Sequence, residues 1–155
     1  MINSITKLYE RDLLKLKQEI ELYGNEADLW KIQGGIANSA GNLALHLIGS
    51  LNHFLGNHLG GIDYVRNRPL EFSDKNVPKI EIVAKIEATR QMLNEVLPKI
   101  SGEVLAQKQT DGENSNEYFV IQLYGHFNYH LGQINYHRRL LTNRNNGTET
   151  ATSAI

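Results

Sequence analysis

Three histidines and one glutamine share a single stripe of a helical segment near the C-terminus. The segment runs from residue 124 to residue 137 and contains His126, His130, Gln133 and His137. Successive residues of an α-helix turn by about 100°, so all four side chains fall within a stripe roughly 60° wide. A stripe that faces the core of a helical protein is normally apolar. Polar, mostly nitrogen-bearing side chains at these positions therefore indicate a partner for them, and we predict a divalent metal ion.

A third imidazole for such an ion is available much earlier in the chain. The i, i+4 pair of His126 and His130 places two imidazoles within reach of one ion. His46 lies in an apolar helical run, where an unpaired charged imidazole would be costly, and we predict it as the third ligand. Three histidine nitrogens leave at least one position open for water or substrate. The structural alternative is that each histidine is a core residue with a hydrogen-bond partner of its own.

His53, His137 and Gln133 are candidates for a second layer around the ion. His53 follows His46 by seven residues and His137 follows His130 by seven, so each lies on the same face of its helix about two turns along. We expect His53 and His137 to form this layer together, where they would bind substrate, orient metal-bound water or transfer protons near neutral pH. His58, by contrast, is expected to be a bystander.

Arg66 and Arg68 are candidate substrate-binding residues. They lie in the segment 60–76, which is rich in Gly, Arg, Asn and Pro and shows neither helical nor strand periodicity. A loop of this length in a compact domain is often functional, and a guanidinium would grip a substrate carboxylate or phosphate. The structural alternative is that these arginines pair with Asp63, Glu71 or another helix.

Apolar residues at helical spacing predict four long helices, at about 4–23, 39–57, 78–100 and 117–141. We expect Ser4 to cap the first helix, a short helical turn at 26–35 and a loop at 102–116. Gly125 and Gly132 are expected to permit close helix packing. No convincing strand is found, so the fold class is all-α, an antiparallel four-helix bundle. We assign residues 1–142 to a single domain and expect the polar tail 143–155 to be disordered.

Composition excludes several classes of protein. The 155 residues carry a formal net charge of −1 without a basic cluster, which argues against binding to nucleic acid. The chain contains no cysteine, which excludes disulfides, thiolate ligands and a cysteine nucleophile. No signal peptide and no apolar stretch of roughly 20 residues are present. We therefore expect a cytoplasmic protein without a membrane partner that acts on a small-molecule substrate.

Two motifs resemble those of the DinB-like (DinB/YfiT) superfamily of metal-dependent enzymes. The first is Asn-Leu-Ala-Leu-His-Leu at 42–47, and the second is His-Phe-Asn-Tyr-His-Leu-Gly-Gln at 126–133. The sequence departs from many relatives at Tyr129, where they have His, and at Leu131, where they have Arg. The resemblance implies a four-helix bundle of up-down-down-up topology in which 60–76 is a long crossover connection. It also implies a homodimer and a divalent metal held by the three histidines that match the family motif, His46, His126 and His130.

The resemblance and the histidine pattern lead to two hypotheses about function. The first is a metal-dependent enzyme, either a transferase that uses a low-molecular-weight thiol, as in characterised branches of the family, or a hydrolase. Its metal, for which zinc or nickel is expected, would lower the pKa of a bound thiol or water. The second is a non-catalytic helical bundle that binds a small ligand or a partner and uses its histidines structurally. The catalytic residues and the substrate are not readable from the sequence.

Overall fold

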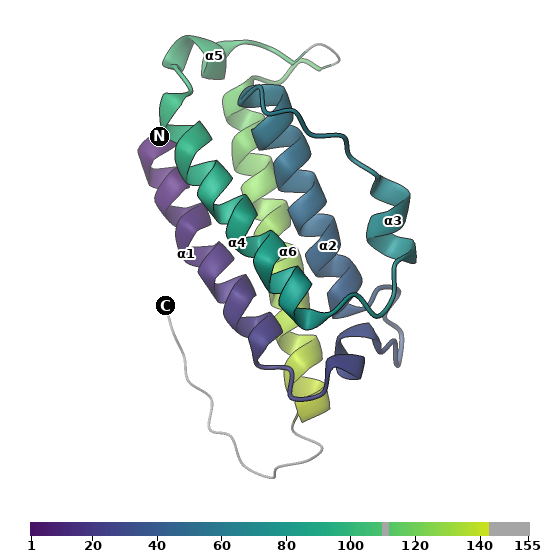
Figure 1. Ribbon diagram of the computed structural model, residues 1–155. Coiled ribbons are helices and arrows are strands. Elements are labelled where there is room, and N and C mark those ends of the chain that lie inside the picture. The colour runs from purple at the N-terminus through teal and green to yellow at the C-terminus, as the bar shows by residue number, and fades with distance from the viewer. Residues whose placement is uncertain (110–111, 143–155) are drawn as a thin grey trace.

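The computed structural model describes residues 1–109 and 112–142, and most of these residues are helical (Figure 1). The α-helices are α1 (Ile2–Glu21), α2 (Ala40–Leu51), α3 (Arg68–Ser73), α4 (Lys79–Val96), α5 (Gly102–Ala106) and α6 (Asn116–Thr142). Shorter elements are the 3₁₀ turns η1 (Glu26–Trp30) and η3 (Leu97–Lys99) and the π-helix η2 (Asn52–Leu59), which continues α2. No strand occurs within the described ranges. The all-α prediction is thus confirmed for them, while the tail 143–155 lies outside the described residues.

The four long helices α1, α2, α4 and α6 lie side by side (Figure 1). α1 contacts both α4 and α6, and α2 contacts the same two helices. α2 and α4 run in one direction, whereas α1 and α6 run in the opposite one. None of the described helices combines the length and the apolar character that crossing a membrane requires.

The core lies between these helices and is built from the apolar faces that the sequence pattern indicates. On α1 the buried side chains recur every three or four residues, at Ile5, Tyr9, Leu13, Leu16 and Ile20. Fully burying one such aliphatic side chain contributes about 1.5–3 kcal/mol. The predicted N-cap is wrong, because α1 begins at Ile2 and its first turn closes on the carbonyl of Met1 rather than on Ser4.

Two segments expected to be loops contain short helices. Within 60–76, α3 starts at Arg68, where the Asn67 side chain accepts a hydrogen bond from the Leu70 amide and Pro69 lies in the first turn. Within 102–116, α5 follows Ser101, whose hydroxyl accepts from the Val104 amide at 3.2 Å. Both helices are too short to produce a recognisable apolar period. Only their capping residues could have predicted them from the sequence.

The expected role of Gly125 and Gly132 in helix packing is wrong. Both are exposed on α6, and a Cβ atom added to either would meet no other atom within 4 Å. Gly41 on α2 is one glycine that does permit close packing, because a Cβ there would lie 2.8 Å from the Trp30 ring.

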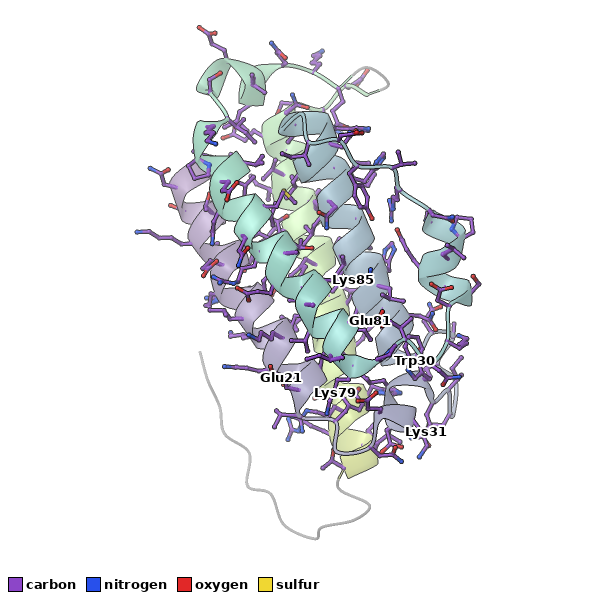
Figure 2. All side chains as sticks on the ribbon, viewed as in Figure 1. Glu21, Trp30, Lys31, Lys79, Glu81 and Lys85 are labelled. Carbon is purple, nitrogen blue, oxygen red and sulfur yellow. The ribbon has the colours of Figure 1, made fainter. Side chains whose placement is uncertain are left out.

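The connection between α1 and α2 is fastened at one end of the molecule, where Lys79 at the start of α4 lies close to Glu21 at the end of α1 (Figure 2). The ammonium of Lys79 donates to the carbonyl of Tyr23 at 2.9 Å, and its backbone amide donates to the Glu26 carboxylate at 3.1 Å. The start of α4 therefore holds η1 in place beneath α2.

Candidate metal centre

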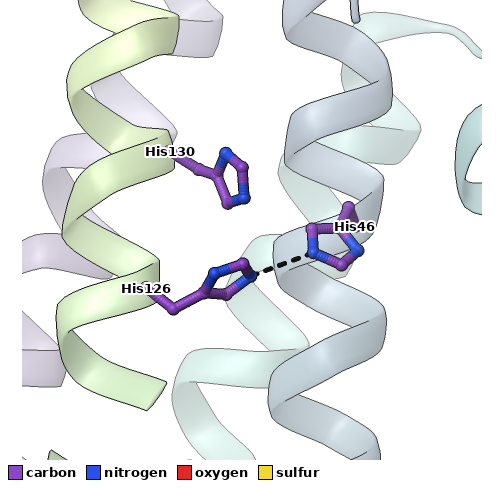
Figure 3. A group of neighbouring side chains, drawn as sticks. All are labelled: His46, His126 and His130. Atoms are coloured by element: carbon purple, nitrogen blue, oxygen red, sulfur yellow. Dashed lines mark hydrogen bonds between the residues drawn. The ribbon is translucent and has the colours of Figure 1, made fainter. Parts of the chain in front are cut away.

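His46, His126 and His130 come together between α2 and α6. His46 projects from α2, and the other two project toward it from successive turns of α6 (Figure 3). Each ring offers one ligand nitrogen, and these three atoms lie within 4.8 Å of one another. Nε2 of His46 and Nε2 of His126 are 3.0 Å apart. The structure therefore brings together the three imidazoles that the sequence predicts as metal ligands.

The outer nitrogen of His46 contacts a buried carboxylate. Nδ1 of His46 lies 2.9 Å from Oε2 of Glu71. Since an ionised carboxylate only accepts hydrogen bonds, Nδ1 carries the proton and donates it to Glu71. The lone pair of His46 consequently lies on Nε2, the nitrogen that faces the other two histidines. A carboxylate behind a ligating histidine is a recurrent arrangement that fixes the tautomer and orients the ring.

Glu71 is itself held on three sides. Arg66 donates to both carboxylate oxygens, at 2.7 and 2.9 Å, in a bidentate pair whose two side chains are nearly buried. The carboxylate also rests against the backbone of α2 at Gly49, where an added Cβ would lie 2.0 Å from Oε1. The mid-helix glycine is thus required by the close approach of Glu71.

Asn42 fixes the helix that carries Glu71. Its side-chain amide donates to the backbone carbonyls of Glu71 and Asp74, at 3.0 and 2.9 Å, and its own carbonyl accepts from the Lys75 ammonium at 2.6 Å. Asn42 is almost fully buried. α3 is therefore anchored to α2 through a side chain one turn before His46.

Gln133 performs for His130 the role that Glu71 performs for His46. Its Oε1 lies 2.6 Å from Nδ1 of His130. With the amide oxygen as acceptor, Nδ1 of His130 is the donor, and Nε2 retains the lone pair. Gln133 thus lies beside the histidine cluster, as predicted for a second layer.

The surroundings favour the neutral form of two of the imidazoles, His46 and His126. Burial lowers the pKa of His46, although the hydrogen bond to Glu71 opposes this shift. Burial, together with the neighbouring His130 and His46, lowers the pKa of His126 to about 4. Neutral imidazole is the form that binds a metal ion, because it offers a nitrogen lone pair.

His137 lies away from the cluster and has its own partners. Its Nε2 donates to the carbonyl of Lys31 at 2.9 Å, and its Nδ1 accepts from the hydroxyl of Tyr23 at 2.7 Å. Both ring nitrogens of this buried side chain are therefore satisfied within the fold, which is the structural alternative considered for these histidines.

His53 lies beyond the opposite side of the cluster. The wide π turn places it against His58, with ring centroids 4.3 Å apart, and its buried Nδ1 has no hydrogen-bond partner among the described residues. The expected layer of His53 and His137 does not form, because α2 and α6 are antiparallel. His53 lies seven residues after His46, next to Phe54. Phe54 packs on Phe119, which precedes the histidines of α6.

The two candidate substrate-binding arginines both contact residues of the fold. Arg66 pairs with Glu71, as the structural alternative anticipated. The guanidinium of Arg68 lies over the Phe72 ring, 5.2 Å from its centroid. Phe72 in turn packs on His46, with ring centroids 5.0 Å apart. Both arginines thus belong to the shell that surrounds His46.

Sequence reasoning missed three residues of this site, namely Glu71, Gly49 and Asn42. Glu71 was considered only as an ion-pair partner for an arginine. The sequence feature that could have predicted its place is the helix start at Asn67 and Pro69, which puts Glu71 on a short helix. Gly49 stands within an otherwise apolar helix, where glycine costs about 1 kcal/mol and therefore indicates a close approach.

Comparison with known proteins adds no relative. No protein-family model matches the chain, and neither a curated protein nor a solved structure matches it significantly.

Proposed function

We propose that this protein is a divalent-metal-dependent enzyme whose ion is held by His46, His126 and His130. The observation that carries the proposal is the approach of three ligand nitrogens to within 4.8 Å of one another. They come from two helices that are distant in sequence, and two of the rings are oriented by Glu71 and Gln133.

The donor set fits such an ion. Tetrahedral ligands placed about 2.0–2.1 Å from zinc stand roughly 3.3 Å apart, close to the 3.0 Å between Nε2 of His46 and Nε2 of His126. His46 and His130 already hold their protons on Nδ1. Only His126 has to change: its Nε2–H donates to His46, and this proton would move to Nδ1 when Nε2 binds an ion. Zinc and nickel both accept imidazole ligands.

We also propose that the fold is a DinB-like four-helix bundle of up-down-down-up topology, formed by α1, α2, α4 and α6. The contacts of α1 and α2 with the other two helices, and the shared direction of α2 and α4, support this assignment. The long segment 60–76 is then the crossover connection, interrupted by α3.

The proposed reaction class is transfer to or from a low-molecular-weight thiol, or hydrolysis. Three protein ligands leave a position for an exogenous group, and a bound divalent ion would lower the pKa of a thiol or water there. The chain has no cysteine, so a thiol nucleophile would be a cosubstrate. The protein's own contribution is to present three imidazoles to one point and to fix two of them, His46 from Glu71 on α3 and His130 from Gln133.

One observation favours the alternative, a non-catalytic helical bundle with structural histidines. The Nε2 atoms of His46 and His126 are hydrogen-bonded to each other at 3.0 Å. In the same way, both ring nitrogens of His137 are hydrogen-bonded within the fold, to Tyr23 and Lys31. Two histidines that are hydrogen-bonded to each other need no metal ion as a partner.

Metal content separates the two functions. After chelation and reconstitution with zinc, we expect about one ion per chain in the wild type and a loss of at least ten-fold in affinity in His126→Ala and His130→Ala. His58→Ala, which removes an exposed histidine outside the triad, is the matched control and should bind zinc normally. Zinc should also raise the melting temperature of the wild type, since it binds only the folded state. Equal zinc binding by all three variants, with no change in melting, would exclude this site.

A further inference from the structure

A cavity of about 510 Å³ lies beside the histidine cluster, between the segment 33–43 and the second half of α6. Its walls include Ile36, Leu43, Tyr129, Tyr136 and Leu140. Among the residues that the structure describes, no Asp, Glu, Lys or Arg side chain lines it. The volume is typical of a small-molecule site, and this lining would disfavour a charged ligand, because no opposite charge would offset the loss of its hydration.

The cavity and the histidine cluster share a wall. His130 and Gln133 both line the cavity, and they are hydrogen-bonded to each other through Nδ1 and Oε1. Since the amide oxygen of Gln133 is used by His130, its amide NH₂ remains to donate to a molecule in the cavity. A ligand seated here would therefore touch the ring of a proposed metal ligand and the residue that orients it.

The opposite end of the cavity is held by the fold. His137 lines it, and both of its ring nitrogens are already bonded, to Tyr23 and to Lys31. Trp30 packs on Gly41 at the start of α2, so the chain just before segment 33–43 is tied to the helical end of that segment. These contacts make the cavity a preformed site rather than a gap between mobile parts.

We propose that this cavity binds an uncharged, largely apolar group of the substrate and directs it toward the face of His130. The inference rests on the proposed function in one respect only, that the bound group belongs to a substrate of the metal centre. The cavity itself is tested without metal. The polar side chains of the lining include the amides of Gln33, Asn38 and Gln133 and the hydroxyls of Tyr129 and Tyr136. They suit a neutral polar substituent better than an anion, which would find no counter-charge there.

The test uses N-phenyl-1-naphthylamine, a neutral fluorescent probe, and its sulfonated counterpart 8-anilino-1-naphthalenesulfonate. Both are titrated into the full chain in the presence of a chelator. We expect the neutral probe to bind at least ten-fold more tightly than the anion. Leu140→Glu, which places a charge in the cavity wall, should weaken the neutral probe at least ten-fold. Ile121→Glu is the matched control, since it changes an exposed apolar residue of the same helix outside the cavity.

A second pair of variants fills the space instead of charging it. Gly35 lines the cavity, and a Cβ there would meet no atom within 4 Å, so Gly35→Leu should occupy part of the volume. Gly24→Leu, at a glycine that is equally unobstructed but outside the cavity, should leave probe binding unchanged. Anion binding as strong as that of the neutral probe, or equal probe affinity in Leu140→Glu and Ile121→Glu, would overturn the proposal.

A separate experiment tests whether one ligand can bind the metal ion and occupy the cavity at the same time. In zinc-loaded protein, 4-phenylimidazole should bind at least ten-fold more tightly than imidazole, because the ion takes the ring nitrogen and the cavity takes the phenyl group. Leu140→Glu should abolish this gain. If zinc is bound but the phenyl group adds no affinity, the cavity does not serve the metal centre. If no zinc is bound while the neutral probe still distinguishes the variants, the proposed function fails and the cavity assignment stands.

Discussion

Replacing Glu71 by glutamine is the most informative perturbation of this site. The substitution preserves shape but removes the charge that three donors share, namely Nδ1 of His46 and two nitrogens of Arg66. The single carbonyl oxygen of Gln can accept hydrogen bonds from only some of these three donors. The NH₂ group of Gln then faces a remaining donor, with which it cannot form a hydrogen bond. Two consequences follow, one for the stability of the fold and one for metal affinity.

The stability effect comes from Arg66. Its side chain is 11% exposed and that of Glu71 is 7% exposed, so the variant leaves a charge buried without its partner. Breaking a buried ion pair in this way costs about 3–5 kcal/mol, which we expect as the loss of unfolding free energy in denaturant titrations with a chelator present. The double variant Glu71→Gln with Arg66→Met removes the unpaired charge and should recover most of that loss.

The metal effect comes from His46. Removing a carboxylate that orients a ligating histidine lowers metal affinity by about 10–100-fold, which corresponds to roughly 1.4–2.7 kcal/mol. Competition against a zinc-chelating dye should show this loss in both the single and the double variant, because neither has the carboxylate. Wild-type zinc affinity in the stable double variant would refute the role assigned to Glu71.

Two further predictions concern the helix beneath Glu71 and the protonation of the cluster. Gly49→Ala should destabilise the protein in thermal unfolding, because its Cβ would lie 2.0 Å from the Glu71 carboxylate. Gly132→Ala, at an exposed position of α6, should instead stabilise it by up to about 1 kcal/mol; equal gains in both variants would contradict the close approach. The lowered pKa of His126, about 4 against about 6.5 in an unfolded chain, means that the unfolded state binds more protons between these values. Metal-free protein should therefore lose unfolding free energy as the pH falls from about 6.5 toward 4, and a pH profile identical in His126→Gln would exclude His126 as the group responsible.

Periodicity predicted the parts of the site that lie on long helices. The four-residue spacing of His126 and His130 fixes their common face whatever the neighbouring helices do. The apolar run around His46 required that helix to be buried, which limited the directions in which an imidazole could find a partner. Burial alone does not say which neighbouring helix His46 faces, because α2 packs against both α4 and α6.

The same pattern could not predict which residues meet along the helix axis. A helical wheel gives the angle of His53 and His137 but not the direction of each helix relative to its neighbour. In the antiparallel pair, residues after His46 meet residues before His126, so two positions that match on the wheel separate in space. Only the connection between the helices decides this direction, and the chain between α2 and α6 is too long for its length to reveal it.

The direction of α2 and α4 also explains why a carboxylate reaches His46 from a connection. These two helices run the same way (Figure 1), so the chain must return along their length before α4 can begin. α2 and η2 together span 40–59, about 30 Å at the helical rise of 1.5 Å per residue. The segment 60–78 could cover about twice that distance if fully extended, which leaves enough chain for one short helix on the way. That helix, α3, lies alongside α2, where Asn42 holds its backbone and Gly49 admits its carboxylate. The topology that separates the two long helices thus creates the outer shell of the proposed metal centre, and a shortened connection that removed α3 would cost His46 its partner while leaving all three imidazoles in place.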